Sequence, residues 1–130
     1  MSAPEIGTEE RLGDEFAQAL FAKDFAGVRE LLDPDIDFRA LTPNRTWEAA
    51  DADALVEGIL KVWFEDSDEL LELQSVESGQ VADRRRVTYR FQGRNPDGPF
   101  VVEQQAYYAT EGGRISWMRT VCSGFRPPED

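Results

Sequence analysis

Histidine is absent from the 130-residue chain, and cysteine occurs once, as Cys122. Because histidine is the commonest general base near neutral pH and the commonest metal ligand, a Ser-His-Asp or Cys-His mechanism would need a histidine from a partner chain. We therefore expect neither a metal nor a cofactor. One cysteine cannot form an internal disulfide, which is typical of a cytoplasmic protein. Any catalysis must rely on Asp, Glu, Tyr, Lys, Arg, the single Cys or positioned water.

Long hydrophobic runs and an excess of basic residues are also missing. No apolar run approaches the roughly 20 residues of a membrane span, and the N-terminus lacks the basic and apolar regions of a signal peptide. The chain has 14 basic and 26 acidic residues, with a formal net charge of −12. Because such a surface repels phosphate, we expect neither nucleic acid nor a membrane as partner, and the charge serves mainly solubility.

Apolar side chains are nevertheless abundant enough for a packed core. Hydrophobic residues make up 41% of the chain and aromatic residues 11%, which is typical of a globular protein rather than a disordered one. The length suits one domain. We predict a single domain over residues 1–130, with loose ends at 1–7 and 126–130.

The first half of the chain shows helical periodicity. Apolar residues recur at i+4 spacing over residues 9–22, and Thr8 precedes them as a predicted N-cap. Asp24 is the predicted cap of a short second helix, which ends near Asp33-Pro34-Asp35 because a residue before proline avoids the helical region. Asp51 is the predicted cap of a third helix with a wide apolar stripe.

The remaining segments alternate apolar and polar residues with a period of two, which predicts strands. The first strand is expected at 36–41 and is followed by a loop carrying Trp47. Short connections rich in glycine, asparagine and proline make the later strands antiparallel neighbours. These strands are expected at 69–78, 81–92, 100–110 and 114–125. The predicted fold class is therefore α+β.

Three local features, in this order, resemble the nuclear transport factor 2-like superfamily, and within it the SnoaL-like group of polyketide cyclases and ketosteroid isomerases. They are the segment Leu31-Leu32-Asp33-Pro34-Asp35-Ile36-Asp37-Phe38, the capped helix after Trp47, and Gly113-Arg114-Ile115-Ser116-Trp117-Met118-Arg119. The resemblance implies a cone-shaped fold with three N-terminal helices packed on a strongly curved, mostly antiparallel sheet. It also implies a pocket inside the cone and a homodimer through the outer face of the sheet.

Strand parity indicates which side chains face the interior and could bind a ligand. Gln104 and Tyr108 are the polar groups most expected to point inward, and Tyr89 shares this ambiguity between a ligand contact and core packing. The aromatic candidates are equally consistent with core packing, and Cys122 fits the role of a small buried side chain because no histidine activates it. The full candidate set is Phe38, Trp47, Trp63, Tyr89, Gln104, Tyr108, Met118, Thr120 and Cys122.

The catalytic residues of the related enzymes have no counterpart here. The aspartate base that ketosteroid isomerases carry late in the first strand corresponds to a place near Ala40. The aspartate of limonene epoxide hydrolases on the last strand corresponds to Thr120, and dehydratases of this group use histidines. The catalytic residues are therefore unknown. One interpretation is a pocket protein for a small apolar molecule, as a histidine-free cyclase, isomerase or dehydratase-like lyase acting through shape and hydrogen bonds. The alternative is a non-catalytic dimeric ligand-binding or assembly module.

Overall fold

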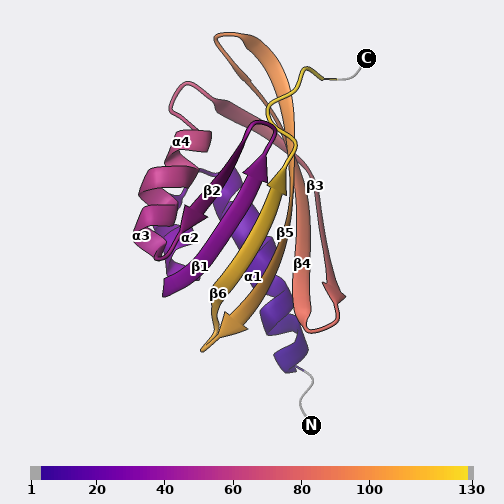
Figure 1. The fold of residues 1–130 in the computed structure, drawn as a ribbon. Helices are drawn as coiled ribbons and strands as arrows, with labels where there is room; N and C mark the ends of the chain where they lie inside the picture. The colour runs from indigo at the N-terminus through magenta and orange to yellow at the C-terminus, as the bar shows by residue number, and fades with distance from the viewer. Residues whose placement is uncertain (1–3, 129–130) are drawn as a thin grey trace.

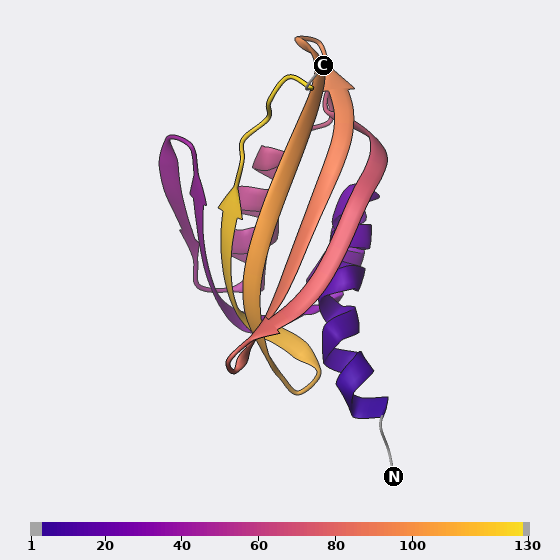
Figure 2. The same cartoon turned by 90° about the vertical axis from the view of Figure 1, so that its right-hand side faces the viewer.

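Helices cover one face of a single curved β-sheet and leave the other face open (Figures 1 and 2). The structure is a computed structural model that describes the backbone of residues 4–128 and the side chains from residue 11 to residue 128. The predicted α+β class and the three N-terminal helices on a mostly antiparallel sheet are confirmed. None of the helices in the described part has the length and hydropathy needed to span a membrane.

Helix α1 runs over Pro4–Phe21 and so begins earlier than the sequence pattern predicted. Thr8 lies inside the helix, so its prediction as N-cap was wrong, and residues 4–7 are helical rather than loose. Proline suits a first helical position because it has no N–H group that would need a partner. The apolar stripe is confirmed, since Leu12, Phe16 and Leu20 are buried. Residues 1–3 lie outside the described part.

The other two helices begin at the predicted aspartate caps. Helix α2 covers Phe25–Glu30, and the Asp24 carboxylate accepts a hydrogen bond from the Gly27 N–H at 3.0 Å. The third helix is a continuous stretch made of α3 (Ala52–Leu55), the π-helical turn η1 (Val56–Leu60) and α4 (Lys61–Trp63). Asp51 caps it by accepting from the Ala54 N–H at 2.7 Å. Each cap satisfies a helix N–H group that would otherwise lack a partner.

The sheet has six strands in the order β2-β1-β6-β5-β4-β3. Neighbouring strands are antiparallel except β1 and β6, which are parallel. Register shifts within β3, and between β5 and β6 at Ala109/Thr110, mark irregularities of the kind that bend a sheet. The strands are β1 Leu32–Thr42, β2 Arg45–Ala49, β3 Glu69–Val81, β4 Arg84–Asn95, β5 Gly98–Glu111 and β6 Arg114–Cys122.

Two turns differ from the sequence prediction. Trp47 lies in strand β2 rather than in a loop, because residues 43–44 form the turn of a β1–β2 hairpin. The turn predicted at Ser78-Gly79 lies instead at residues 82–83, and Gly79 pairs with Arg86 inside the ladder. A Cβ atom on Gly79 would stand 2.5 Å from the Arg86 guanidinium, so glycine here leaves room for a side chain and does not make a turn.

The C-terminal segment is also more ordered than a loose end. The Arg126 N–H donates to the Val101 carbonyl at 2.9 Å, and the Val101 N–H donates to the Arg126 carbonyl at 2.8 Å. Backbone pairing of this kind fixes Arg126 beside β5, which corrects the prediction of a loose end at this residue. Residues 129–130 lie outside the described part.

Candidate ligand pocket

The candidate residues predicted on strands gather on one patch of the helix-facing side of the sheet. Their cross-strand registers place them in three adjacent rows. Written in the strand order from β2 toward β4, the rows are Ala49–Phe38–Met118–Tyr108, then Trp47–Ala40–Thr120–Ala106–Val87, and then, beginning at β6, Cys122–Gln104–Tyr89. All of these side chains are buried except Trp47, which is half-buried. Strand parity therefore predicted the inward face correctly.

The polar centre of this patch is a hydrogen-bonded pair on β4 and β5. The Tyr89 hydroxyl donates to the Gln104 Oε1 atom at 2.5 Å, and the two side chains are 1% and 2% exposed. The other end of the amide, Gln104 Nε2, is buried and has no hydrogen-bond partner among the described residues. Because Tyr89 occupies the carbonyl end, the amide is left with a free N–H donor inside the protein.

Tyr89 acts as a neutral hydrogen-bond donor. Burial, helped by the nearby Cys122, raises the pKa of the Tyr89 phenol well above its ordinary value of 10.0. Desolvation disfavours the charged phenolate, so the hydroxyl keeps its proton throughout the physiological range. The group can therefore orient Gln104 but is unsuited to proton transfer near neutral pH.

Aromatic side chains close the patch on the side of the third helix. The Trp63 ring lies with its centroid 6.3 Å from that of Phe38 and 5.7 Å from that of Trp47, in an edge-to-face contact with the latter. Trp63 Nε1 is buried and, within residues 11–128, has no hydrogen-bond partner. Buried indole N–H groups usually find a partner, so this is a second free donor near the patch.

Two tryptophans show where the patch comes closest to solvent. Apart from Trp47, the side chains of the three rows are at most 8% exposed. Trp47 and Trp63 are half-buried. The most exposed side chains of the patch therefore lie at the end of the third helix and in the β1–β2 hairpin, which stand at the same end of the molecule in Figure 1.

Tyr108, at the closed end of the patch, has a structural contact. Its hydroxyl accepts a hydrogen bond from the Gly13 N–H of α1 at 3.1 Å. A Cβ atom on Gly13 would stand 2.7 Å from this hydroxyl, so glycine permits the close approach. This bond joins the first helix to β5.

Arg45 belongs to the same region, although the sequence analysis did not identify it. Its guanidinium lies 3.7 Å from the centre of the Trp47 ring. Arg45 and Trp47 are two positions apart on β2, so they share the helix-facing side. The Arg-x-Trp spacing could have indicated this pair, but the segment had been interpreted as a loop.

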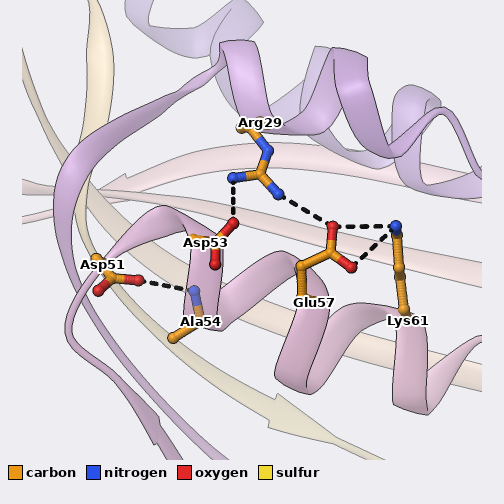
Figure 3. A network of polar contacts seen from close by, with 6 residues as sticks. All are labelled: Arg29, Asp51, Asp53, Ala54, Glu57 and Lys61. Carbon is orange, nitrogen blue, oxygen red and sulfur yellow. Dashed lines mark hydrogen bonds and ion pairs between the residues drawn. The ribbon is translucent and has the colours of Figure 1, made fainter.

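The third helix is tied to α2 by ion pairs, shown in Figure 3. Arg29 contacts Asp53 at 3.0 Å and Glu57 at 3.1 Å, and Lys61 contacts Glu57 at 3.0 Å. These contacts span the π-helical turn, in which backbone bonds are irregular and which often marks a functional site. The exposed ion pairs therefore add to the packing of the buried Val56, Ile59 and Leu60 side chains at this turn.

The open face of the sheet carries hollows of its own. One of about 360 Å³ is bordered by residues of β1, β2, β5 and β6, among them Trp47 and Thr120. Another of about 520 Å³ lies beside the C-terminal segment. On this face Trp117 is stacked between the guanidinium groups of Arg84 and Arg119, which lie 4.3 and 4.5 Å from its ring centre.

Comparison with known proteins defines the fold. No family model matches the sequence, and no curated protein matches it. A candidate isomerase from Bacillus subtilis is similar, with a TM-score of 0.74 and 18% identity over 95% of this chain and 90% of that one. A candidate polyketide cyclase from Xanthomonas campestris pv. campestris has a TM-score of 0.69 and 16% identity, over 88% of this chain and 90% of that one. A nuclear transport factor 2-like protein from Burkholderia thailandensis has a TM-score of 0.66 and 16% identity, over 88% and 89% of the two chains.

The fold is therefore the one shared by this nuclear transport factor 2-like protein, the candidate cyclase and the candidate isomerase. The predicted resemblance is confirmed as a likeness of fold.

Proposed function

We propose that the protein binds a small, mostly apolar molecule with a carbonyl group, between the third helix and the sheet. The observation that carries this proposal is the unpartnered Gln104 Nε2 atom in the interior. A buried donor without a partner costs about 1–3 kcal/mol. A ligand oxygen that accepts its hydrogen bond recovers this energy, whereas an entirely apolar ligand does not.

The Tyr89–Gln104 pair supports recognition of an acceptor rather than a donor. Gln104 Oε1 already accepts from the Tyr89 hydroxyl. With the amide in this orientation the hydroxyl occupies its Oε1 end, so the N–H end is the one directed at the ligand. A ketone, aldehyde or ester carbonyl satisfies this donor, and the surrounding Phe38, Met118 and Trp63 side chains supply the apolar wall.

Access for the ligand requires movement of the Trp63 ring and of the helix end that carries it. In the structure Trp63 contacts both Phe38 and Trp47, so a bound molecule must displace this ring. The π-helical turn η1 lies directly before α4, which ends at Trp63, and it contains Gly58, whose surroundings are open. A helix end that follows such an irregular turn can shift with little loss of regular hydrogen bonding.

Binding is better supported than a reaction. Among the described residues, the buried polar side chains are Asp68, Gln104 and Thr120. The Asp68 carboxylate lies in the loop before β3, where it accepts hydrogen bonds from the Glu65 N–H and from the Asn95 side chain of β4. It therefore stabilises that loop. The interior patch thus presents hydrogen-bond donors without a carboxylate base. If the pocket accelerates a cyclisation or isomerisation, it does so by orienting the substrate and by stabilising negative charge on its carbonyl oxygen.

The test compares two probes of nearly equal shape, 2-acetylnaphthalene and 2-ethylnaphthalene, by tryptophan fluorescence titration. We expect wild type to bind the ketone about tenfold more tightly, as one hydrogen bond to a buried donor is worth roughly 1–2 kcal/mol. Gln104→Leu should remove this preference. Gln105→Leu is the matched control, because Gln105 is the next residue on β5 but faces outward, where it bonds to Tyr107. Failure of both probes to bind would refute the proposal.

A second function, as a dimeric module, is favoured by the open face of the sheet. Leu41 and Val121 are neighbours in the β1–β6 register and are 50% and 56% exposed. Arginines 39, 84, 86, 90 and 119 fall on the outward parity of this face, although the chain as a whole is strongly acidic. An apolar strip with aromatic and arginine neighbours is typical of an interface.

Sedimentation velocity at tens of micromolar tests the dimer. We expect a dimer for wild type and a monomer for Val121→Glu, because the variant places a carboxylate in the apolar strip. Val62→Glu is the control, since Val62 is 48% exposed but lies on α4. A wild-type monomer, or a Val121→Glu dimer, would exclude this interface.

A further inference from the structure

Arg45 stands at the solvent-exposed end of the candidate patch, where its guanidinium is stacked on an aromatic ring. Several other arginines, including Arg29, Arg94 and Arg119, are paired with carboxylates. Within residues 11–128, by contrast, Arg45 forms no ion pair, and its guanidinium lies on the Trp47 ring at 3.7 Å from the ring centre. In a chain with 26 acidic residues, a cation left without a carboxylate is available for an external anion.

The stacked geometry leaves the binding edge of the guanidinium free. A guanidinium that lies over an aromatic ring uses its flat face, whereas its N–H groups point outward in its own plane. Those N–H groups match the two oxygens of a carboxylate in a bidentate pair. Stacking on Trp47 also restricts the long side chain, so less conformational entropy is lost when an anion binds.

The hairpin that presents Arg45 is itself fixed by hydrogen bonds. Trp47 Nε1 donates to Thr42 Oγ1 at 3.0 Å, and Thr42 Oγ1 donates to the Arg45 carbonyl at 3.2 Å. Thr42 and Arg45 are also partners in the β1–β2 ladder. The positions of the indole and of the residue stacked on it are thus set by the turn and not by a flexible loop.

The location links Arg45 to the interior patch. Trp47 touches Trp63 edge-to-face, and Trp63 touches Phe38, so an aromatic path leads from Arg45 into the buried rows. A molecule inside the pocket with its apolar body along this path would bring its outer end to the guanidinium. The inner end then meets the Gln104 amide and the outer end meets a cation.

We propose that the ligand is an amphipathic acid, with a carboxylate at its solvent-facing end that Arg45 binds. This proposal rests on the interior binding function and specifies the class of molecule that the site takes. Arg45 then determines specificity by favouring acids over neutral molecules with the same apolar body. Because Trp47 orients the Arg45 guanidinium, Arg45 is suited to bind a planar anion such as a carboxylate and does not merely attract negative charge.

The experiment uses flexible probes that differ only in their end group, decanoate and decanamide, titrated against full-length protein at pH 7 with tryptophan fluorescence as readout. Wild type is expected to bind decanoate about tenfold more tightly, as a charge-assisted bidentate pair is worth a few kcal/mol in favourable geometry and less near solvent. Arg45→Gln should lower decanoate affinity to that of decanamide and leave decanamide unchanged. Arg45→Lys should keep only part of the preference for decanoate, because lysine retains the positive charge but cannot form the bidentate pair of a guanidinium.

Arg114→Gln is the matched control, because Arg114 is an exposed arginine at the start of β6, at the opposite end of that strand from the solvent-exposed end of the patch. It should keep the full preference for decanoate. Equal affinities of wild type for the two probes, or a preference that survives in Arg45→Gln, would overturn the proposal. If 2-acetylnaphthalene binds while this preference is absent, the interior pocket stands and only the anion site fails. If none of the probes binds, the interior pocket itself is refuted.

Discussion

At the scale of the residue, the proposed function depends on Gln104 and Tyr89. They are partners in the β4–β5 ladder, and their side chains meet in the interior at 2.5 Å. Strand parity was sufficient to place both groups inside, because alternate residues of a strand face the same side. Parity could not show that the phenol binds one end of the amide and leaves the other free, since this depends on distances across strands.

The raised pKa of Tyr89 leads to a pH prediction at the same scale. The folded protein keeps the phenol protonated, while the unfolded chain loses this proton above about pH 10. The stabilising contribution is therefore complete below pH 10 and is lost as the pH rises further. We expect the free energy of unfolding of wild type to fall between pH 9 and pH 11 by about 1.4 kcal/mol more than that of Tyr89→Phe.

Urea denaturation at the two pH values measures this difference. Tyr107→Phe is the control, since it removes a partly exposed tyrosine of β5 and should keep the full alkaline loss of wild type. Equal losses in wild type and Tyr89→Phe would show that Tyr89 titrates in the folded protein as it does in the unfolded chain.

The β1–β2 hairpin shows the limit of sequence prediction at the scale of the element. The segment around Trp47 lacks the regular apolar alternation of a strand, because Arg45, Thr46 and Glu48 are polar. On an edge strand only the side that faces the helices must be apolar, and here it carries Trp47 and Ala49. The Arg45–Trp47 pair was missed for the same reason.

The ion pairs of Figure 3 predict a small, salt-dependent stabilisation of the third helix. Arg29→Gln breaks the contacts with Asp53 and Glu57, whose side chains are 76% and 49% exposed. Pairs as exposed as these contribute little, so we expect a loss of about 0.2–1 kcal/mol in the free energy of unfolding. The difference should largely vanish in 1 M NaCl, where charges are screened beyond about 3 Å.

Urea unfolding at 0.05 M and 1 M NaCl, with Arg114→Gln as control, measures the contribution. A loss that stays the same at both salt concentrations would mean that Arg29 acts through packing rather than through charge.

The arrangement of the whole molecule followed from the order of its elements. Capped helices before long hairpin-connected strands predicted the α+β architecture and the likeness to nuclear transport factor 2-like proteins. Asp24 and Asp51 marked helix starts correctly, because capping is a local property of the sequence. The parallel β1–β6 pairing, which brings Ala40 beside Thr120, joins segments about 80 residues apart, so no local pattern contains it.

In the whole molecule, the two faces of the sheet have different properties. The helix-facing side holds the free donors and the aromatic wall, whereas the open side holds the exposed apolar strip and most of the stacked arginines. A ligand inside and a second copy outside are therefore compatible, because they use opposite sides of the same strands.

A crystal structure of the protein with 2-acetylnaphthalene tests the central claim most directly. The account predicts the naphthalene between Trp63 and the sheet, with its carbonyl oxygen within about 3.2 Å of Gln104 Nε2. It also predicts that Trp63 moves away from Phe38 and Trp47 to admit the ring. A ligand found only in the hollow of the open face, with Trp63 and Gln104 unmoved, would contradict the account.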